Sequence, residues 1–183
     1  KTRARVGEIT LNGRKFETPI LMPVATSAAI KGLHTKDLVE SSNAEIILAN
    51  TYHLYLRPGD QIIKNCGGIH DFMSWDKLVL TDSGGYQVYS LSNNRKIKED
   101  GVKFKSHIDG SYHFFSPEKA IQIQKNIGAD IIMAFDECTP YPCTKDYARK
   151  SMNLTHRWLK RCINEFENIE KNKSREQILF PII

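Results

Sequence analysis

The chain has 183 residues, of which 40% are hydrophobic and 26% are charged, and its formal net charge is +5. These values are typical of a folded globular domain and exclude a disordered or low-complexity chain. The longest apolar runs have only the length of a strand, so no membrane-spanning segment is expected. The positive charge suits a polyanionic partner such as a nucleic acid but does not identify one.

The first predicted element is a small antiparallel hairpin. Apolar and polar residues alternate from about Val6 to Thr18 around Asn12-Gly13, a pair that favours a type I′ turn. We expect this hairpin to be an addition to the core.

The core is predicted from short, nearly continuous apolar runs, which are typical of strands buried on both faces. Helical patterns separate most of these runs, and this alternation indicates a parallel sheet. The predicted strands are Ile20 to Val24, Ile46 to Ala49, Leu78 to Leu80, Ile131 to Phe135 and Ile178 to Ile183. The predicted helices lie around Thr35 to Ser41, Gly59 to Asn65, Pro117 to Ile127 and Lys145 to Ile169.

A second hairpin is predicted from about Val102 to Phe115, with its turn at Asp109-Gly110. Like the first, it is expected to decorate the core. One of its faces is expected to carry Val102, Phe104 and Ile108.

The third and fourth helices have the clearest boundaries. Ser116 is a predicted N-cap before Pro117, and Gly128 is a predicted C-terminal stop. The fourth helix is expected to end in a loop at Lys171 to Glu176. The inward residues are expected to be Ala120, Ile123 and Ile127 on the third helix and Leu154, Trp158, Cys162 and Phe166 on the fourth.

Polar residues follow three of the apolar runs directly. They form the segments Asn50-Thr51-Tyr52-His53, Asp82-Ser83-Gly84-Gly85 and Asp136-Glu137-Cys138-Thr139. Active sites of (β/α)8 barrels lie at the carboxyl ends of their strands. No Gly-x-Gly-x-x-Gly follows a strand, which disfavours a dinucleotide-binding sheet. We therefore predict a TIM-like barrel. Because five strands cannot close an eight-stranded barrel, residues 1–183 are expected to be a single domain forming its amino-terminal part.

The cysteines, Cys66, Cys138, Cys143 and Cys162, are too widely spaced for a paired Cys-x-x-Cys zinc site. They are interpreted as reduced thiols of a cytoplasmic protein, because no secretory signal is recognisable. The histidines His53, His107 and His113 show no metal-ligand spacing and are interpreted as structural or surface residues.

The chain resembles the tRNA-guanine transglycosylases over nearly its whole length. The two longest matching motifs are Thr81-Asp82-Ser83-Gly84-Gly85-Tyr86-Gln87-Val88-Tyr89-Ser90 and Phe135-Asp136-Glu137-Cys138-Thr139-Pro140-Tyr141-Pro142. Shorter matches are Thr18 to Val24, Ala49 to Leu54, Arg57-Pro58-Gly59 and Phe115 to Glu118. The resemblance implies a TIM-like barrel with a small antiparallel sheet near its start.

This resemblance also implies an activity, namely the exchange of guanine at the wobble position of tRNA for a 7-deazaguanine during queuosine biosynthesis. The family's aspartate nucleophile, a base-contacting glutamine and a structural zinc belong to a carboxyl-terminal part that is absent from residues 1–183. We therefore expect this chain to bind no metal or cofactor and to be inactive alone. The full-length protein is expected to be a homodimer acting on tRNA, without membrane association.

Seven residues are carried over from the family's motifs. Asp82 is the predicted general acid or base and also contacts the purine, and Asp136 is predicted to bind its guanine-type edge. Tyr86 is predicted to stack on the base, and Cys138 matches bacterial members, which favours the precursor preQ1 over queuine. The remaining predicted substrate-binding residues are Ser83, Gly84 and Gly85.

Purely structural interpretations, without a role in substrate binding, exist for several of these positions. Asp82 could cap a helix, Asp136 could form a turn, Tyr86 could be a core aromatic and the glycines an ordinary turn. Two other functions also fit a chain of this kind. One is a non-catalytic RNA-binding subunit of the same family, and the other is an unrelated glycoside hydrolase using Asp82 and Asp136.

Overall fold

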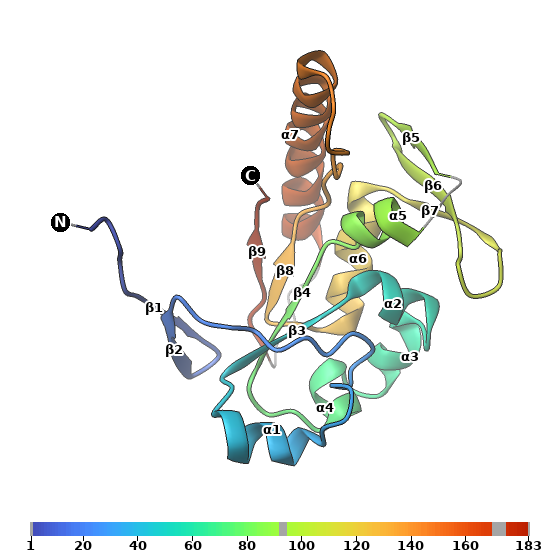
Figure 1. Cartoon of the computed structure of the whole chain (residues 1–183). Helices are drawn as coiled ribbons and strands as arrows, with labels where there is room; N and C mark the ends of the chain where they lie inside the picture. The colour runs from blue at the N-terminus through green and yellow to red at the C-terminus, as the bar shows by residue number, and fades with distance from the viewer. Residues whose placement is uncertain (1, 92–94, 170–174, 183) are drawn as a thin grey trace.

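The structure is a computed structural model that describes residues 2–91, 95–169 and 175–182 (Figure 1). Its strands are β1 (Gly7–Leu11), β2 (Arg14–Thr18), β3 (Ile46–Ala49), β4 (Leu78–Thr81), β5 (Lys96–Lys98), β6 (Gly101–Lys105), β7 (Tyr112–Phe115), β8 (Ile131–Met133) and β9 (Ile178–Phe180). Its helices are α1 (Thr35–Ser42), α2 (Thr51–Leu56), α3 (Asp60–Asn65), α4 (Ile69–Met73), α5 (Gly85–Leu91), α6 (Pro117–Ile127) and α7 (Lys145–Asn168). Among the described residues, no helix has both the length and the apolar character needed to cross a membrane.

The centre of the molecule is a parallel sheet in the order β3-β4-β8-β9. Neighbouring strands in this order are parallel, with Ile46 of β3 opposite Leu78 of β4 and Ile131 of β8 opposite Ile178 of β9. The strands β3, β4 and β8 are largely buried on both faces, as their apolar sequences predicted, whereas all residues of β9 are only partly buried. The chain is therefore α/β with a parallel sheet, and smaller antiparallel units flank it.

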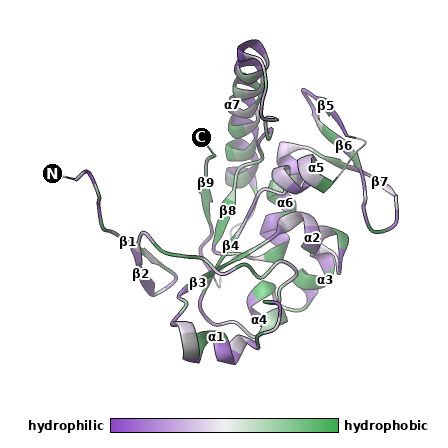
Figure 2. Cartoon of the chain, in the orientation of Figure 1, coloured by the Kyte–Doolittle hydropathy of each residue, from purple (hydrophilic) through white to green (hydrophobic). Residues whose placement is uncertain are grey.

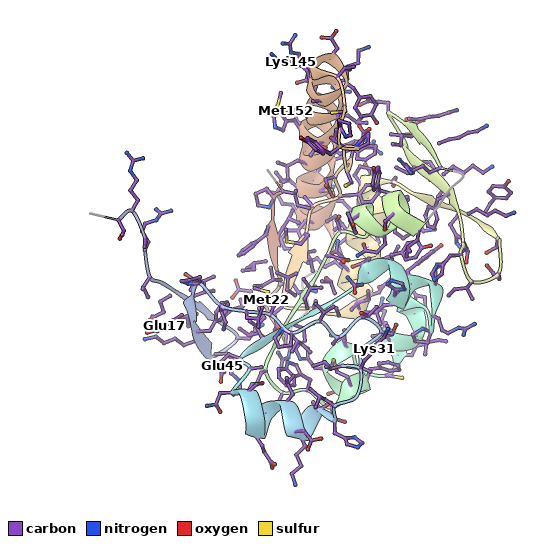
Figure 3. All side chains as sticks on the ribbon, in the orientation of Figure 1. Glu17, Met22, Lys31, Glu45, Lys145 and Met152 are labelled. Atoms are coloured by element: carbon purple, nitrogen blue, oxygen red, sulfur yellow. The ribbon has the colours of Figure 1, made fainter. Side chains whose placement is uncertain are left out.

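The two faces of the sheet are covered by different elements. The helices α6 and α7 cover one face, where Trp158 and Cys162 are fully buried. On the other face, Leu11 and Phe16 from the β1–β2 hairpin join a second apolar cluster. Figure 2 shows hydrophobic residues along β8 and β9, whereas α7 carries both kinds along its length. The first turns of α7, with Lys145 and Met152, project beyond the strands (Figure 3).

The β1–β2 hairpin has the predicted turn, because Asn12 and Gly13 both adopt positive φ. Helix α6 matches its predicted range, with the Ser116 side chain accepting from the Lys119 amide and Gly128 in the left-handed conformation. Helix α7 ends at Asn168, one residue before the prediction. Of the predicted loop at Lys171 to Glu176, residues 171–174 lie outside the described part of the chain.

The predicted strand Ile20 to Val24 was wrong. Only Val24 forms a parallel bridge, with Leu48, supported by hydrogen bonds from the Ala25 amide to the Leu48 oxygen and from the Leu48 amide to the Pro23 oxygen. Proline has no amide hydrogen, so Pro19 and Pro23 prevent a regular ladder. The segment lies beside β3 without becoming a strand.

The second hairpin also differs from its prediction. Residues 106–111 form a longer loop between β6 and β7. Ile108, in this loop, is exposed, whereas Val102 and Phe104, on β6, are buried. The unpredicted strand β5 adds a third member to this sheet. Because Val102, Phe104 and Phe115 belong to the main core, the sheet is part of the core and not a decoration. The short helices α2, α4 and α5 were not predicted.

A buried amide joins α6 to the parallel sheet. Gln124 Oε1 accepts hydrogen bonds from Thr81 Oγ1 (3.0 Å) and the Met133 amide (2.9 Å). Gln124 Nε2 donates to the Met133 oxygen (2.9 Å) and the Ala120 oxygen (3.2 Å). The side chain therefore lies between β4 and β8 where their own ladder ends, after Ile132.

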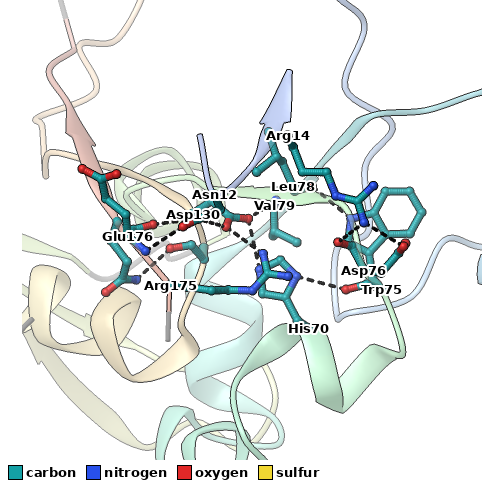
Figure 4. A network of polar contacts seen from close by, with 12 residues as sticks. Asn12, Arg14, His70, Trp75, Asp76, Leu78, Val79, Asp130, Arg175 and Glu176 are labelled. Carbon is teal, nitrogen blue, oxygen red and sulfur yellow. Dashed lines mark hydrogen bonds and ion pairs between the residues drawn. The ribbon is translucent and has the colours of Figure 1, made fainter. Parts of the chain in front are cut away.

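A second buried polar group lies at the amino-terminal ends of the strands (Figure 4). Asp130 is fully buried and accepts hydrogen bonds from Asn12 Nδ2 (2.6 Å), the Val79 amide (2.8 Å) and Arg175 (2.9 Å). His70 Nε2 lies 3.0 Å from Asp130 Oδ2, the oxygen that also accepts from the Val79 amide. This network ties the first hairpin, α4, β4 and the start of β9 to one carboxylate.

Candidate active site

Three loops bring polar residues together at the carboxyl ends of β3, β4 and β8. They begin with Asn50, Asp82 and, after the apolar pair at 134–135, Asp136. Because the strands are parallel, these loops lie at the same edge of the sheet. The Asp82 amide donates to the Ala49 oxygen (3.2 Å), which fixes the β4 loop beside the β3 loop.

The Asp82 carboxylate is surrounded by hydrogen-bond donors. Its Oδ1 accepts from the amides of Thr51 (2.9 Å) and Gly84 (3.2 Å). Its Oδ2 accepts from Gln87 Nε2 (2.9 Å) and from Asn50 Nδ2. A carboxylate accepts about four hydrogen bonds. Asp82 is therefore held in one orientation, and a ligand must displace a donor to bind it.

Asp136 lies against the β4 loop and has fewer partners. Ser83 Oγ donates to Asp136 Oδ1 (2.9 Å) and accepts from the Gly85 amide (3.1 Å). A Cβ atom on Gly85 would lie 2.8 Å from both the main-chain oxygen and Oδ1 of Asp136. Gly85 is therefore required for the contact between the two loops.

The neighbouring Gly84 has φ +80°, a conformation that favours glycine. A Cβ atom there would lie 3.2 Å from the Phe115 ring. Both glycines are therefore explained by contacts within the protein.

Burial raises the pKa of both carboxyls. For Asp82, burial outweighs the hydrogen bonds from Asn50, Thr51, Gln87 and Gly84, which lower the pKa. For Asp136, burial and the nearby charge of Asp82 raise the pKa, and the hydrogen bond from Ser83 lowers it. The Asp82 charge is thus close enough to oppose the ionisation of Asp136, as expected for carboxylates that share a site.

These shifts predict a pH-dependent effect of Asp136→Asn on stability. A raised pKa means that the folded state binds the proton more tightly, so the stabilisation is complete below the ordinary value of 3.8 and is lost as pH rises through the folded pKa. The variant has no such loss. In urea titrations, its free energy of unfolding relative to the parent should increase from pH 4 to pH 7. Glu167→Gln, at an exposed position on α7, controls for loss of one negative charge. A difference that stays constant with pH would contradict this prediction.

The other predicted site residues lie around this pair. Cys138 and Asp136 line a small hollow with Gly85, Ile97 and Val102, and burial raises the pKa of the Cys138 thiol. Tyr86, on the first turn of α5, is 62% exposed, which rules out the core-aromatic interpretation. The roles assigned to these side chains on a substrate stay predictions.

Several contributors were not predicted in their observed roles. Asn50, Thr51 and Gln87 hold Asp82, and only their position beside the predicted motifs could have indicated it. Burial and the nearby His107 lower the pKa of His53, and the charge of Asp82 partly opposes this shift. His107 and His113 contact the hydroxyl groups of tyrosines on α2, in keeping with a structural role.

A larger cavity lies at the opposite end of the parallel strands. It measures about 960 Å³, and its lining includes His70, Trp75, Gly128 and Arg175, which precede β4, β8 and β9. None of the seven predicted site residues lines it. We place the candidate site at the carboxylate pair and not here, because size alone does not provide reactive groups.

The potential metal ligands in the described part of the chain are its His, Cys, Asp and Glu side chains. Within residues 2–91, 95–169 and 175–182, no three His, Cys, Asp or Glu side chains gather in a way that could hold a metal ion. The four cysteines are free, and Cys162 is buried, which raises its thiol pKa to about 12. The zinc that the resemblance assigned to another region stays a prediction.

The chain was compared with known proteins. A model of the family described as queuine tRNA-ribosyltransferase matches residues 1–183. Queuine tRNA-ribosyltransferases from Acetivibrio thermocellus and Halothermothrix orenii are each 56% identical to it, over 98% and 100% of this chain and 46% and 47% of the relatives. One from Fusobacterium nucleatum is 52% identical over 99% of this chain and 47% of its own length.

The chain spans about half the length of the curated relatives it matches. The match of the family model covers the whole chain, including both motifs that carry the carboxylates. The chain therefore belongs to the queuine tRNA-ribosyltransferase family.

Proposed function

We propose that this chain forms the purine-binding part of a tRNA-guanine transglycosylase, which exchanges guanine at the wobble position of tRNA for preQ1. The observation that carries the proposal is the pairing of Asp82 and Asp136 at neighbouring strand ends, linked through Ser83. Membership of a family named for a tRNA ribosyltransferase supports the reaction class.

Asp136 is the better placed group for recognising the base. Ser83 takes part of its accepting capacity, and the remainder can accept hydrogen bonds from the ring N–H and exocyclic amine of a guanine-type edge. Adenine does not present this donor pair, so it would leave the remaining accepting capacity of a partly buried carboxylate unused. This arrangement selects 2-amino-6-oxo purines.

Asp82 is proposed to handle the proton that moves when a purine leaves or arrives. Breaking the glycosidic bond places negative charge on the departing base, and a carboxyl with a raised pKa can supply a proton to it. Because four donors hold the carboxylate, the bound purine must replace one of them. Gln87 is a suitable group to be replaced, since its buried Oε1 has no hydrogen-bond partner among the described residues.

The remaining site residues shape the pocket. Gly84 and Gly85 let the β4 loop meet Asp136, and the exposed Tyr86 is available to stack on an extruded base. Cys138 borders the hollow beside Asp136, and we assign it to the incoming base. The small aminomethyl base preQ1 is the proposed partner at this position, in preference to queuine.

The architecture proposed for the whole protein is a TIM-like (β/α)8 barrel, with residues 1–183 as its amino-terminal part. The sequential order of neighbouring strands supports this, since a doubly wound sheet reverses its order. The aspartate nucleophile, the structural zinc and the homodimer contacts are assigned to the remainder of the protein. We therefore expect a cytoplasmic enzyme and no exchange by this chain alone.

The base-binding role can be tested by calorimetric titration of the chain with guanine, preQ1 and adenine. Guanine and preQ1 should bind more tightly than adenine, and Asp136→Ala should weaken both by at least about tenfold, because a paired polar group is lost. Asp76→Ala, at the other end of the strands, is the matched control. Equal guanine affinity in the Asp136→Ala and Asp76→Ala variants would refute the assignment.

A further inference from the structure

The outward face of the β5–β6–β7 sheet has an unusual composition. The strand residues that point inward include Val102, Phe104 and Phe115, which are apolar and buried. The residues that alternate with them are exposed, except for the buried Gly101 on β6. We call these six residues the basic-aromatic face, and they are Lys96, Lys98, Lys103, Lys105, Tyr112 and Phe114.

The register of the sheet brings these side chains close together. Lys103 pairs with Lys96 on one side and Phe114 on the other, and Lys105 pairs with Tyr112. The Lys103 ammonium lies 4.8 Å from the centre of the Tyr112 ring, and that of Lys105 lies 6.0 Å away. The three strands contain no acidic residue. Four positive charges and two aromatic rings therefore share one surface.

Protection of sheet edges does not explain this pattern. Lysines on an edge strand discourage pairing with another chain. That reason applies to Lys96 and Lys98 on the edge strand β5, but Lys103 and Lys105 lie on the central strand β6. Edge protection also gives no reason for exposing Tyr112 (62%) and Phe114 (42%) on β7.

The face is held firmly relative to the candidate site. Arg157 forms two hydrogen bonds with Glu99 (2.7 and 2.8 Å) in the β5–β6 turn, and Trp158 Nε1 donates to the Glu99 oxygen (2.7 Å). On the inner side of the same sheet, Ile97 and Val102 line the hollow that contains Asp136. Figure 1 shows this sheet at the edge of the molecule, beside α5 and α6. Only the β5–β6–β7 sheet thus separates a ligand on its outer face from the hollow that contains Asp136.

We infer that the basic-aromatic face binds a strand of RNA, with its lysines contacting phosphates and with Tyr112 and Phe114 stacking on unpaired bases. Basic surfaces with interleaved aromatic rings suit single-stranded nucleic acids, because every base offers a flat face whatever its sequence. An acidic protein would satisfy the lysines but leave the rings without a stacking partner. The choice of RNA over DNA rests on the proposed function.

The lysines can be tested by fluorescence anisotropy with a labelled RNA hairpin that has an unpaired loop. The variant Lys96→Gln/Lys98→Gln/Lys103→Gln/Lys105→Gln should bind at least about tenfold more weakly at about 0.1 M salt. It should also reduce the slope of log affinity against log salt by about 2 to 3, because single-stranded contacts contribute about 0.7 each. The control changes Lys15, Lys36, Lys64 and Lys160, four exposed lysines on other elements, to glutamine. Equal loss in the two variants would overturn the inference.

The aromatic residues separate RNA from other polyanions. Tyr112→Ala/Phe114→Ala should weaken binding of the looped hairpin about tenfold and leave binding of heparin unchanged, since heparin has no bases to stack. Loss of heparin and RNA affinity in the lysine variant alone, with no effect of the aromatic variant, would indicate an acidic partner and overturn the RNA assignment. Circular dichroism of each variant checks that the fold is retained.

Failure here is distinguishable from failure of the proposed function. Guanine binding depends on Asp136, and RNA binding by this face does not require it. If Asp136→Ala abolishes guanine binding while the face variants keep full RNA affinity, only the face is refuted. If the face variants lose RNA affinity and no guanine binding is detected, only the purine site is refuted.

Discussion

Asp130→Ala should lower the free energy of unfolding by about 3–5 kcal/mol, because it removes one member of a buried ion-pair network. Asp130 is fully buried, and its oxygens are contacted by Asn12, Val79, Arg175 and His70. Without the carboxylate, three side chains and one backbone amide lose their partner. Urea denaturation followed by circular dichroism measures the loss.

The matched control is Asp76→Ala, which breaks an exposed ion pair with Arg14 (2.9 Å) and should cost no more than about 1 kcal/mol. Burial opposes ionisation of Asp130, but His70, the Val79 amide and Arg175 together hold its pKa below the ordinary value. Its contribution is therefore present above that value and is lost as pH falls through the folded pKa. Equal losses for the two alanine variants would show that the network contributes nothing beyond an exposed pair.

Trp158→Ala should destabilise the chain by about 3–5 kcal/mol, the usual cost of truncating a buried large aromatic residue. Trp158 is fully buried and stacks on Phe135 with ring centres 5.1 Å apart. Phe135 directly precedes Asp136, so we also expect weaker guanine binding in this variant. Urea denaturation and calorimetric titration measure the two effects.

Two further variants test the cause. Trp158→Phe keeps an aromatic ring but loses the hydrogen bond to Glu99, so it should cost only about 1–2 kcal/mol. Tyr141→Ala, at a residue that is 97% exposed, should change stability by less than about 0.5 kcal/mol. A loss for Trp158→Ala no larger than that for Tyr141→Ala would mean that α7 is not needed for the core.

Elements with strong local signals were predictable from the sequence. The Ser116-Pro117 start and the Gly128 stop defined α6, and Asn12-Gly13 defined the first turn. Local backbone preference alone specifies such features. The order of the parallel strands, by contrast, required the assumption that apolar runs adjacent in sequence pair with one another.

The errors arose where long-range contacts decide the structure. The apolar run Ile20 to Val24 resembles a strand, but its prolines leave only one bridge, at Val24. Asp109-Gly110 resembles a hairpin turn, but a six-residue loop at 106–111 forms instead, and within it Ser106 Oγ accepts from the Ile108 amide. Side-chain hydrogen bonds of this kind compete with tight turns and are not visible in a pattern of apolar residues.

The candidate site was predictable in position but not in detail. Polar residues after parallel strands had to meet at one edge, so the proximity of Asp82 and Asp136 followed from the fold. The four donors around Asp82 did not, because Asn50 and Gln87 are brought to it by the packing of α2 and α5. The sequence also did not reveal that Gly85 lies against Asp136, and its predicted contact with a substrate stays a prediction.

The side-chain amide of Gln124 connects α6 to the edge of the sheet that carries the candidate site. Because this one side chain spans the gap between Thr81 and Met133, the spacing of the loops that begin at Asp82 and Ala134 depends on its length as well as on the strand ladder. A residue that contacts neither acidic group thus helps to set the spacing of the loops that carry them.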